Sequence, residues 1–290
     1  MHVRRHGDVD SFLETAGVFL ADREAEHNLI FGILASLRET PEAYTGPAYL
    51  ASVHDDAGAV TAAAIQTPPY RLVLSEIDDE AAVVALADDT VGRDLPGVLG
   101  PVGVVEAFVA HRRGAGGPYA THTETDQVYR ISTVRPPRPV SGGRRPATPA
   151  DRDVVRSFLE GFMLDAFGHA VASEVEGMAD RWLAGRARTL WLWQDADAVT
   201  SLTGIGGPTP NGIRIGPVYT PPTARGRGYA SNLVAEVSQA ALDSGCRFCF
   251  LLTDATNPTA NHIYREIGYE HVRDVHVYEF ERPRAATDSG

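Results

Sequence analysis

Apolar and polar positions divide the chain into segments of helical and strand periodicity, and the order of these segments occurs twice. The pattern predicts helices over 8–40, three strands, a helix, a short strand, another helix and a long strand or hairpin over 119–134. A proline- and glycine-rich stretch at 135–149 is typical of a linker. The same order then returns and ends in strands near 269–280. The expected fold class is α/β, with two tandem units that each combine a mixed β-sheet with flanking helices.

The repeated order sets the expected domain boundaries. The first unit covers 1–134, the linker 135–149 and the second unit 150–282, and 283–290 is expected to be a flexible tail. The remaining expected elements are strands at 48–54, 59–66, 72–74, 97–100, 189–194, 198–204, 212–219 and 248–253, and helices at 79–90, 104–113, 150–166, 172–184, 229–244 and 258–266.

The stretch 213–230 has the composition of an anion site between a strand and a helix. Gly216-Pro217 interrupts the apolar strand and predicts a bulge or splay, and Pro221-Pro222 ends it. The sequence Arg-Gly-Arg-Gly at 225–228 then precedes the helix. Glycines let backbone N–H groups approach a ligand, and a helix N-terminus adds unpaired donors with partial positive charge. A pyrophosphate fits such a site.

Other phosphate-binding loops are excluded by composition and spacing. All 26 basic residues are arginine, whereas a P-loop needs Gly-Lys-Ser/Thr and a Schiff base needs a lysine amine. The dinucleotide fingerprint G-x-G-x-x-G also fails, because Gly226 and Gly228 are followed by Ser231 where that motif needs glycine or alanine.

Two signatures carry a resemblance to a known family. Arg225, Gly228 and Ala230 match the pattern Arg/Gln-x-x-Gly-x-Gly/Ala, and this loop resembles the coenzyme-A loop of the GNAT superfamily, the acyl-CoA-dependent N-acyltransferases. The following segments, helix 229–244 and strand 248–253, form a parallel crossover that puts the loop at the carboxyl end of its strand. The second family pattern, Asn-x-x-Ala-x-x-x-Tyr-x-x-x-Gly-Phe/Tyr, falls on Asn257, Ala260, Tyr264, Gly268 and Tyr269.

The second signature predicts a short helix with two distinct faces. Asn257 is expected as its N-cap, followed by proline at the first helical position. At helical spacing Asn257, Asn261 and Tyr264 share one face, and Ile263 and Ile267 share the core face.

The resemblance implies an enzyme that transfers an acetyl group directly from acetyl-CoA, as co-substrate, to a primary amine without a metal. By position, Tyr264 is implied as the general acid that protonates the departing thiolate. The residues implied in cofactor binding are Val218, Tyr219, Thr220, Arg225, Gly226, Arg227, Gly228, Tyr229, Ala230, Asn257 and Asn261. Two alternatives stay open, a donor other than acetyl-CoA and a non-catalytic acyl-CoA sensor or scaffold.

The general base is not identified by the sequence. The third strand of the second half carries no carboxylate between Ile213 and Thr220, where many relatives have one. The helical region that usually lines the acceptor site offers several titratable side chains, each of which is more typical of a solvated surface. These are Asp165, His169, Glu174 and Glu176. A water chain, or an amine that arrives neutral, also suffices.

The first half departs from the family pattern at the corresponding loop. After its third strand the segment 75–80, Ser-Glu-Ile-Asp-Asp-Glu, places four carboxylates at a helix start. Carboxylates suit a helix N-terminus but repel a pyrophosphate. The first half is therefore expected to be a degenerate unit that does not bind coenzyme A.

Composition narrows the classes of partner. The formal net charge of −12 argues against nucleic-acid binding, and no apolar run reaches the ~18 residues of a membrane span. Cys246 and Cys249 are the only cysteines, too few for a zinc site and consistent with a reducing cytoplasm. We expect a cytoplasmic monomer or homodimer that acts on a small-molecule or peptide amine, with no metal, nucleic acid or membrane partner.

Overall fold

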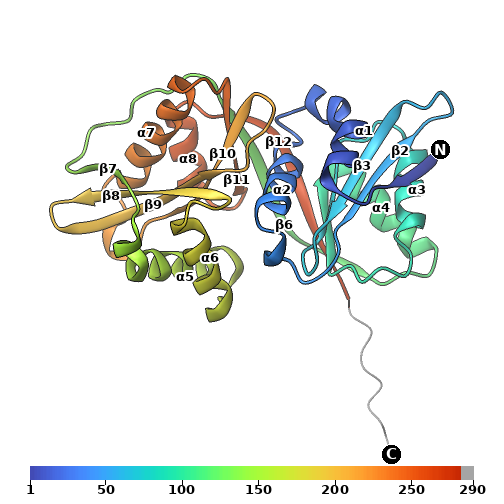
Figure 1. Cartoon of the computed structure of the whole chain (residues 1–290), viewed down its shortest axis with the longest axis horizontal. Helices are drawn as coiled ribbons and strands as arrows, with labels where there is room; N and C mark the ends of the chain where they lie inside the picture. Colours follow the sequence, from blue (N-terminus) through green and yellow to red (C-terminus); the bar gives the residue numbers. More distant parts are fainter. Residues whose placement is uncertain (282–290) are drawn as a thin grey trace, which may run out of the picture.

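The computed structural model describes residues 1–281 and has the mixed α/β fold that the sequence predicts (Figure 1). Helices flank one twelve-stranded sheet with the strand order β1-β2-β3-β4-β5-β12-β6-β11-β10-β9-β8-β7. The pairs β4–β5 and β10–β11 are parallel, and the other neighbours are antiparallel. The predicted tail 283–290 lies outside the described residues.

The elements up to residue 131 agree closely with the periodicity of the sequence. The first strand, which is short and mostly polar, and the 3₁₀ turn η1 were not expected. In chain order they are β1 (His2–Arg5), α1 (Val9–Asp22), α2 (Asn28–Glu39), η1 (Pro41–Ala43), β2 (Tyr49–His54), β3 (Val60–Gln66), β4 (Leu72–Leu74), α3 (Glu80–Asp89), β5 (Gly97–Pro101), α4 (Val102–Gly114) and β6 (Ala120–Ile131).

After β7 and the 3₁₀ turn η2, the second half repeats the order of helices and strands of the first half. Gly143–Pro146, expected as part of the linker, form a strand at the sheet edge and pair with β8. In chain order the elements are β7 (Gly143–Pro146), η2 (Pro149–Asp151), α5 (Arg152–Phe167), α6 (Ala172–Leu183), β8 (Arg188–Asp195), β9 (Ala198–Gly206), β10 (Gly212–Tyr219), η3 (Pro222–Ala224), α7 (Tyr229–Asp243), β11 (Phe248–Asp254), α8 (Pro258–Glu266) and β12 (Glu270–Phe280).

The two halves exchange their last strands. β6, the last strand of the first half, pairs with β11 from Ile131↔Cys249 to Asp126↔Asp254. β12, the last strand of the second half, pairs with β5 of the first half, and β6 and β12 pair with each other along most of their length. The sheet is therefore continuous across the expected domain boundary, and β6 supplies side chains to the second half.

Four apolar clusters form the core, and each unites a pair of helices with one part of the sheet. α1 and α2 pack on the first half with Phe12, Leu20 and Ile30 fully buried, and α3 and α4 pack on it with Leu86 and Phe108. α5 and α6 cover one part of the second half, and α7 and α8 cover another. Within residues 1–281, no helix combines the length and apolar character of a membrane-spanning segment.

Candidate active site

The strands β10 and β11 separate at their carboxyl ends, as the interruption at Gly216 predicted. Their parallel register ends at Arg214↔Phe250, although β10 continues to Tyr219 and β11 to Asp254. On its other side β10 shifts register against β9 between Ile215 and Val218. Gly216 has φ +136°, a conformation that side chains disfavour. The irregularity opens a gap between β10 and β11 at the edge where α/β sheets bind ligands.

The loop after β10 presents a continuous set of unpaired backbone donors. Gly226 and Gly228 have φ of +75° and +83°, and Gly228 is the N-cap residue of α7 without a side-chain cap. Among the described residues, no acceptor is hydrogen-bonded to the backbone N–H groups from Gly226 to Ser231. A helix N-terminus with this many free donors is an anion site.

The two loop arginines differ in environment. The Arg225 Nε donates to the Thr220 carbonyl at 2.9 Å, and its Nη2 contacts the Asp165 carboxylate of α5. Arg227 is exposed and makes no side-chain hydrogen bond within residues 1–281. Arg225 therefore braces the loop against α5, whereas Arg227 is the cation available to a bound phosphate.

Tyr229 and residues of the expected linker 135–149 pack against the loop 225–228. The Tyr229 hydroxyl donates to Asp195 at 2.6 Å, and the Asn232 side-chain amide donates to the Gly228 and Arg138 carbonyls. The Val140 side chain lies so close that a Cβ on Gly228 would be 3.1 Å from it. Residues 135–142 thus border the candidate site, a role that their composition alone did not suggest.

The helix α8 begins as the sequence predicts. The Asn257 Oδ1 accepts from the Ala260 N–H at 3.0 Å, which confirms Asn257 as the N-cap. Asn261 is buried and donates to the Asp254 and Ala255 carbonyls at 3.0 and 3.2 Å. Its Oδ1 has no partner among the described residues, although it is buried. Asn261 therefore fixes the turn after β11 and retains a free acceptor beside the gap.

The expectation that Tyr264 faces away from the core is wrong. Its ring packs with Ile267, Tyr129 and Tyr269, and the side chain is 8% exposed. The short helix and its C-cap residue bury Asn261, Tyr264 and Ile267 as one stripe because the helix lies against the sheet. The Tyr264 hydroxyl has no hydrogen-bond partner within residues 1–281, and burial raises its pKa to about 12. The phenol thus keeps its proton at neutral pH.

The four side chains considered as general base are not gathered at the gap. Asp165 pairs with Arg225, and the His169 ring is hydrogen-bonded to the Phe167 carbonyl on the surface. Glu174 and Glu176 are exposed on α6. None of the four has a buried position of the kind that tunes a catalytic pKa.

A group of carboxylates at the end of β11 was missed by the sequence reasoning. Asp126 of β6 lies opposite Asp254, and the Ala255 N–H donates to the Thr125 carbonyl at 2.8 Å. Burial, followed by the charge of the neighbouring Glu124, raises the pKa of Asp126 to about 7. The available signal was the alternation Thr-Glu-Thr-Asp at 123–126, which puts two carboxylates on one face of a strand. Within residues 1–281, no three His, Cys, Asp or Glu side chains are placed to hold a metal ion.

In the first half, the loop after β4 is occupied by its own side chains. Asp79 caps α3 by accepting from the Ala81 N–H at 2.8 Å. Glu76 is 4% exposed and contacts Arg273 of β12 and, at 3.8 Å, Arg23. Its pKa is raised, because burial outweighs the two arginines. The carboxylates stand where the second half has free N–H donors.

Residues 155–269 match the model of the Acetyltransferase (GNAT) family. A Drosophila protein of known structure aligns with TM-score 0.67 and 13% identity, over 96% of this chain and 98% of its own.

Two further solved structures are similar in fold. A GCN5-related N-acetyltransferase from Sphaerobacter thermophilus aligns with TM-score 0.63 and 17% identity, over 97% of this chain and 96% of its own. One from Kribbella flavida aligns with TM-score 0.58 and 14% identity, over 92% and 98%. No curated protein matches the chain.

Proposed function

We propose that this chain, whose residues 155–269 match the model of the acetyltransferase (GNAT) family, is an acyltransferase that transfers an acetyl group from acetyl-CoA to a primary amine. The transfer is direct: the amine nitrogen attacks the thioester carbonyl carbon, and the carbon–sulfur bond breaks. Holding both reactants at the gap between β10 and β11 supplies much of the rate by proximity.

The unpaired N–H groups from Gly226 to Ser231 are the observation that carries this proposal. They bind the pyrophosphate of coenzyme A, with Arg227 as the nearby cation. The pantetheine arm then runs along the diverging end of β10, past the backbone of Val218 to Thr220. Asn257 and Asn261 flank the arm on the α8 side.

Tyr264 is the proposed proton donor to the leaving thiolate. Its hydroxyl has no partner among the described residues, and its pKa of about 12 keeps it protonated until the thiolate forms. A backbone N–H group of Val218 or Thr220 donates to the thioester carbonyl oxygen. This hydrogen bond stabilises the oxyanion that develops during the attack.

Asp126 is the proposed proton acceptor, contributed to the site by the first half through β6. The pKa of about 7 suits a general base, because a good part of the carboxyl groups is ionised at neutral pH and each can then accept a proton from the amine. Asp126 takes the proton that the attacking amine loses, and the negative charge of the neighbouring Glu124 helps Asp126 to hold it. The base left open by the sequence is thereby assigned to the exchanged strand.

The carboxylates of the first-half loop support a single coenzyme site per chain. We propose that the first half acts as a scaffold that supplies β6 and covers the acceptor side. The acceptor is a small molecule or peptide, and the two cysteines fit a cytoplasmic enzyme acting as a monomer or homodimer.

Calorimetric titration of the purified chain with acetyl-CoA, then with coenzyme A, tests the proposal. We expect one equivalent of acetyl-CoA per chain at micromolar affinity. Two bound equivalents would contradict the proposal that the first half does not bind coenzyme A. Absence of binding by either ligand would remove the proposed function and leave a scaffold.

A further inference from the structure

Two half-buried arginines, Arg188 and Arg214, lie on the sheet face opposite α7. Ile213 and Ile215 of β10 pack in the α7 core, so Arg214 between them points to the other face. On β8, Leu190 and Leu192 pack with α5 and α6, and the alternation places Arg188 on that face too. Both residues pair with Gly206 of the intervening strand, whose missing side chain leaves room for them.

Arg188 is held by the protein, whereas Arg214 is not. The Arg188 Nη1 donates to the Gly216 carbonyl at 2.7 Å, and its guanidinium lies 5.6 Å from the centre of the Trp182 ring. Arg214 makes no side-chain hydrogen bond and no ion pair with any described residue, and its Nε is buried without a partner. Its side chain rests against Gly32 of α2, where an added Cβ would be 2.9 Å from the Arg214 Cδ.

The unpaired charge is costly to the folded protein. Burial, with the positive charge of Arg188 as the second cause, lowers the pKa of Arg214 to about 9, and burial lowers that of Arg188 to about 10. Both groups are still cationic at neutral pH. Both side chains are half-buried, and among the Arg214 nitrogens Nε is the enclosed one without a partner, so the Nη groups stay accessible to a ligand. A buried cation without a partner is unfavourable, and an anionic ligand removes that cost.

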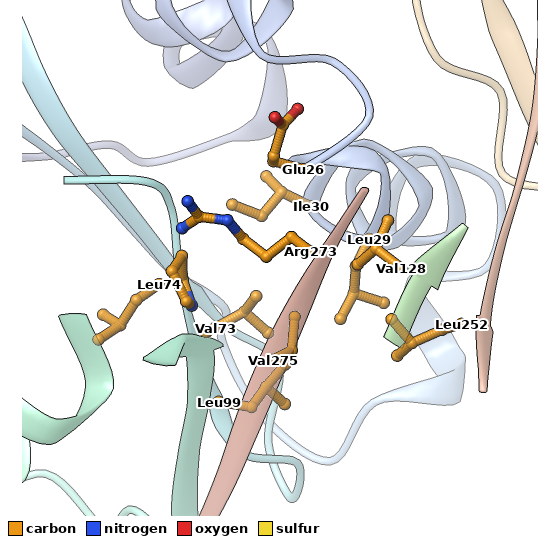
Figure 2. A pocket seen from close by; sticks show the side chains of 12 residues that line it. Glu26, Leu29, Ile30, Val73, Leu74, Leu99, Val128, Leu252, Arg273 and Val275 are labelled. Carbon is orange, nitrogen blue, oxygen red and sulfur yellow. The ribbon is translucent and has the colours of Figure 1, made fainter. Parts of the chain in front are cut away.

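The proposed base lies on the same face as the arginines. Tyr129 and Ile131 of β6 pack in the α7 core, so Val128 and Asp126 point the other way. Figure 2 shows Val128 and Leu252 of this face beside Leu29 and Ile30 of α2, around a cavity of about 20 Å³. The α2 helix of the first half therefore covers the face that carries both charged groups.

The strand β11 lies between β10, which carries Arg214, and β6, which carries Asp126. Arg214 is the last residue of β10 that pairs with β11, and Asp126 pairs with Asp254, the last residue of β11. The Asp126 carboxylate is near enough for its charge to oppose the lowering of the Arg214 pKa. A cationic end and an anionic end thus stand on either side of the place where the thioester is expected.

We infer that the acceptor is a zwitterion of amino-acid size, whose carboxylate binds Arg214 and Arg188 while its amine is delivered to Asp126. A guanidinium binds a carboxylate through two parallel hydrogen bonds, which Arg214 has free to offer. This inference rests on the proposed acetyl transfer and adds to it the chemical class of the acceptor.

The first test compares acids with their amides. Glycine, β-alanine, γ-aminobutyrate and the L-α-amino acids, each beside its carboxamide, are incubated with acetyl-CoA and the wild-type chain while thiol release is followed. We expect the turned-over acids to exceed their carboxamides at least about tenfold in kcat/KM, the range of a charge-assisted hydrogen bond. Arg214→Gln should lose this preference, chiefly through KM, and retain the activity towards the amide.

Arg247→Gln is the matched control, because Arg247 is exposed and its guanidinium lies only over the Phe248 ring, 5.5 Å from its centre. It should keep the wild-type preference. Equal turnover of acids and amides, or turnover of no carboxylate by a chain that binds acetyl-CoA, overturns the inference. Absence of acetyl-CoA binding instead removes the proposed function beneath it.

The second test does not depend on finding an acceptor. If the role of Arg214 is to bind a ligand, Arg214→Met should leave the thermal midpoint of the ligand-free protein unchanged or raise it, since the substitution removes a half-buried cation that has no partner among the described residues. A midpoint lowered by several degrees would show that Arg214 supports the fold and would contradict the inference. Arg188→Met is the comparison, and we expect it to be destabilised through loss of the bond to Gly216.

Discussion

The loops after β4 and β10 occupy equivalent places in the two halves, each between a strand with a parallel neighbour and the helix that follows. The loop after β10 has glycines at left-handed φ and leaves its N–H groups free. The loop after β4 satisfies its helix with the Asp79 side chain and buries Glu76 against Arg273. The N-terminus of α7 is open to a bound anion, whereas the N-terminus of α3 is already capped by the Asp79 carboxylate.

This difference shows that the fold alone does not make the anion site. Both loops join strand to helix in the same topology, but only one lacks side chains that reach the helix N-terminus. The first half contributes instead through its exchanged strand, which brings Asp126 to the second half. The proposed loss of one coenzyme site and the proposed supply of a base to the other are the two sides of this asymmetry.

Converting the open loop into an acidic one should have the largest effect. Gly226 has φ +75° and no atom within 4 Å of an added Cβ, and aspartate and asparagine tolerate this backbone region. Gly226→Asp should weaken acetyl-CoA binding by more than about 100-fold, because the carboxylate repels the pyrophosphate. Calorimetric titration measures the loss.

Gly226→Asn is the control for this change, since it has the same size without the charge. It should lose far less affinity. Equal losses in both variants would show that shape and not charge distinguishes the loops.

Removing the Tyr264 hydroxyl should reduce turnover strongly. We expect Tyr264→Phe to lower kcat by about 100-fold, the usual scale for a general acid. Acetyl-CoA affinity and thermal midpoint should remain as in the wild type, because the hydroxyl has no partner within residues 1–281. Unchanged turnover with any acceptor would remove Tyr264 from the chemistry.

The pH profile should identify the carboxylate supplied by the first half. Since Asp126 must be ionised to act as base, kcat/KM should rise as pH passes about 7. Asp126→Asn should lower kcat/KM by about tenfold or more at pH 8 and abolish this inflection. Asp197→Asn, at the exposed turn between β8 and β9, is the comparison, and an inflection that persists in Asp126→Asn would assign it to another group.

Asp126→Asn should lower activity but raise the stability of the folded chain. The pKa of Asp126 is raised in the folded chain above its unfolded value near 3.8, so the folded state binds more protons between about pH 4 and 7. Stability from this group is present at low pH and is lost as pH rises through 7. Asp126→Asn should therefore raise the thermal midpoint at pH 8 relative to wild type, and raise it less at pH 5. A lower midpoint at pH 8 would contradict a raised pKa of Asp126 in the folded chain.

Disrupting the closed loop should have the smallest effect. Glu76→Gln frees Arg273 and Arg23, but their side chains are 39% and 40% exposed and can turn to solvent. We expect a stability change below about 1 kcal/mol and still one equivalent of acetyl-CoA per chain. A second bound equivalent would mean that Glu76 alone closes the first half.

Local sequence signals predicted much of the candidate site. Apolar periodicity located nearly every helix and strand, and Gly216 marked the separation of β10 from β11. The glycines at 226 and 228 marked the open helix N-terminus, and Asn257 marked the start of α8. These features depend on backbone conformations and caps within a few residues, which composition and spacing specify directly.

The tertiary structure alone decided the remaining features. The exchange of β6 and β12, the position of Asp126 beside Asp254, the burial of Tyr264 and the unpaired state of Arg214 all depend on contacts between distant segments. A strand's periodicity states which side chains share a face, but not which strand it pairs with or what covers it. Partner choice and burial, which set the charges and pKa values of this site, follow from the packing of the whole chain.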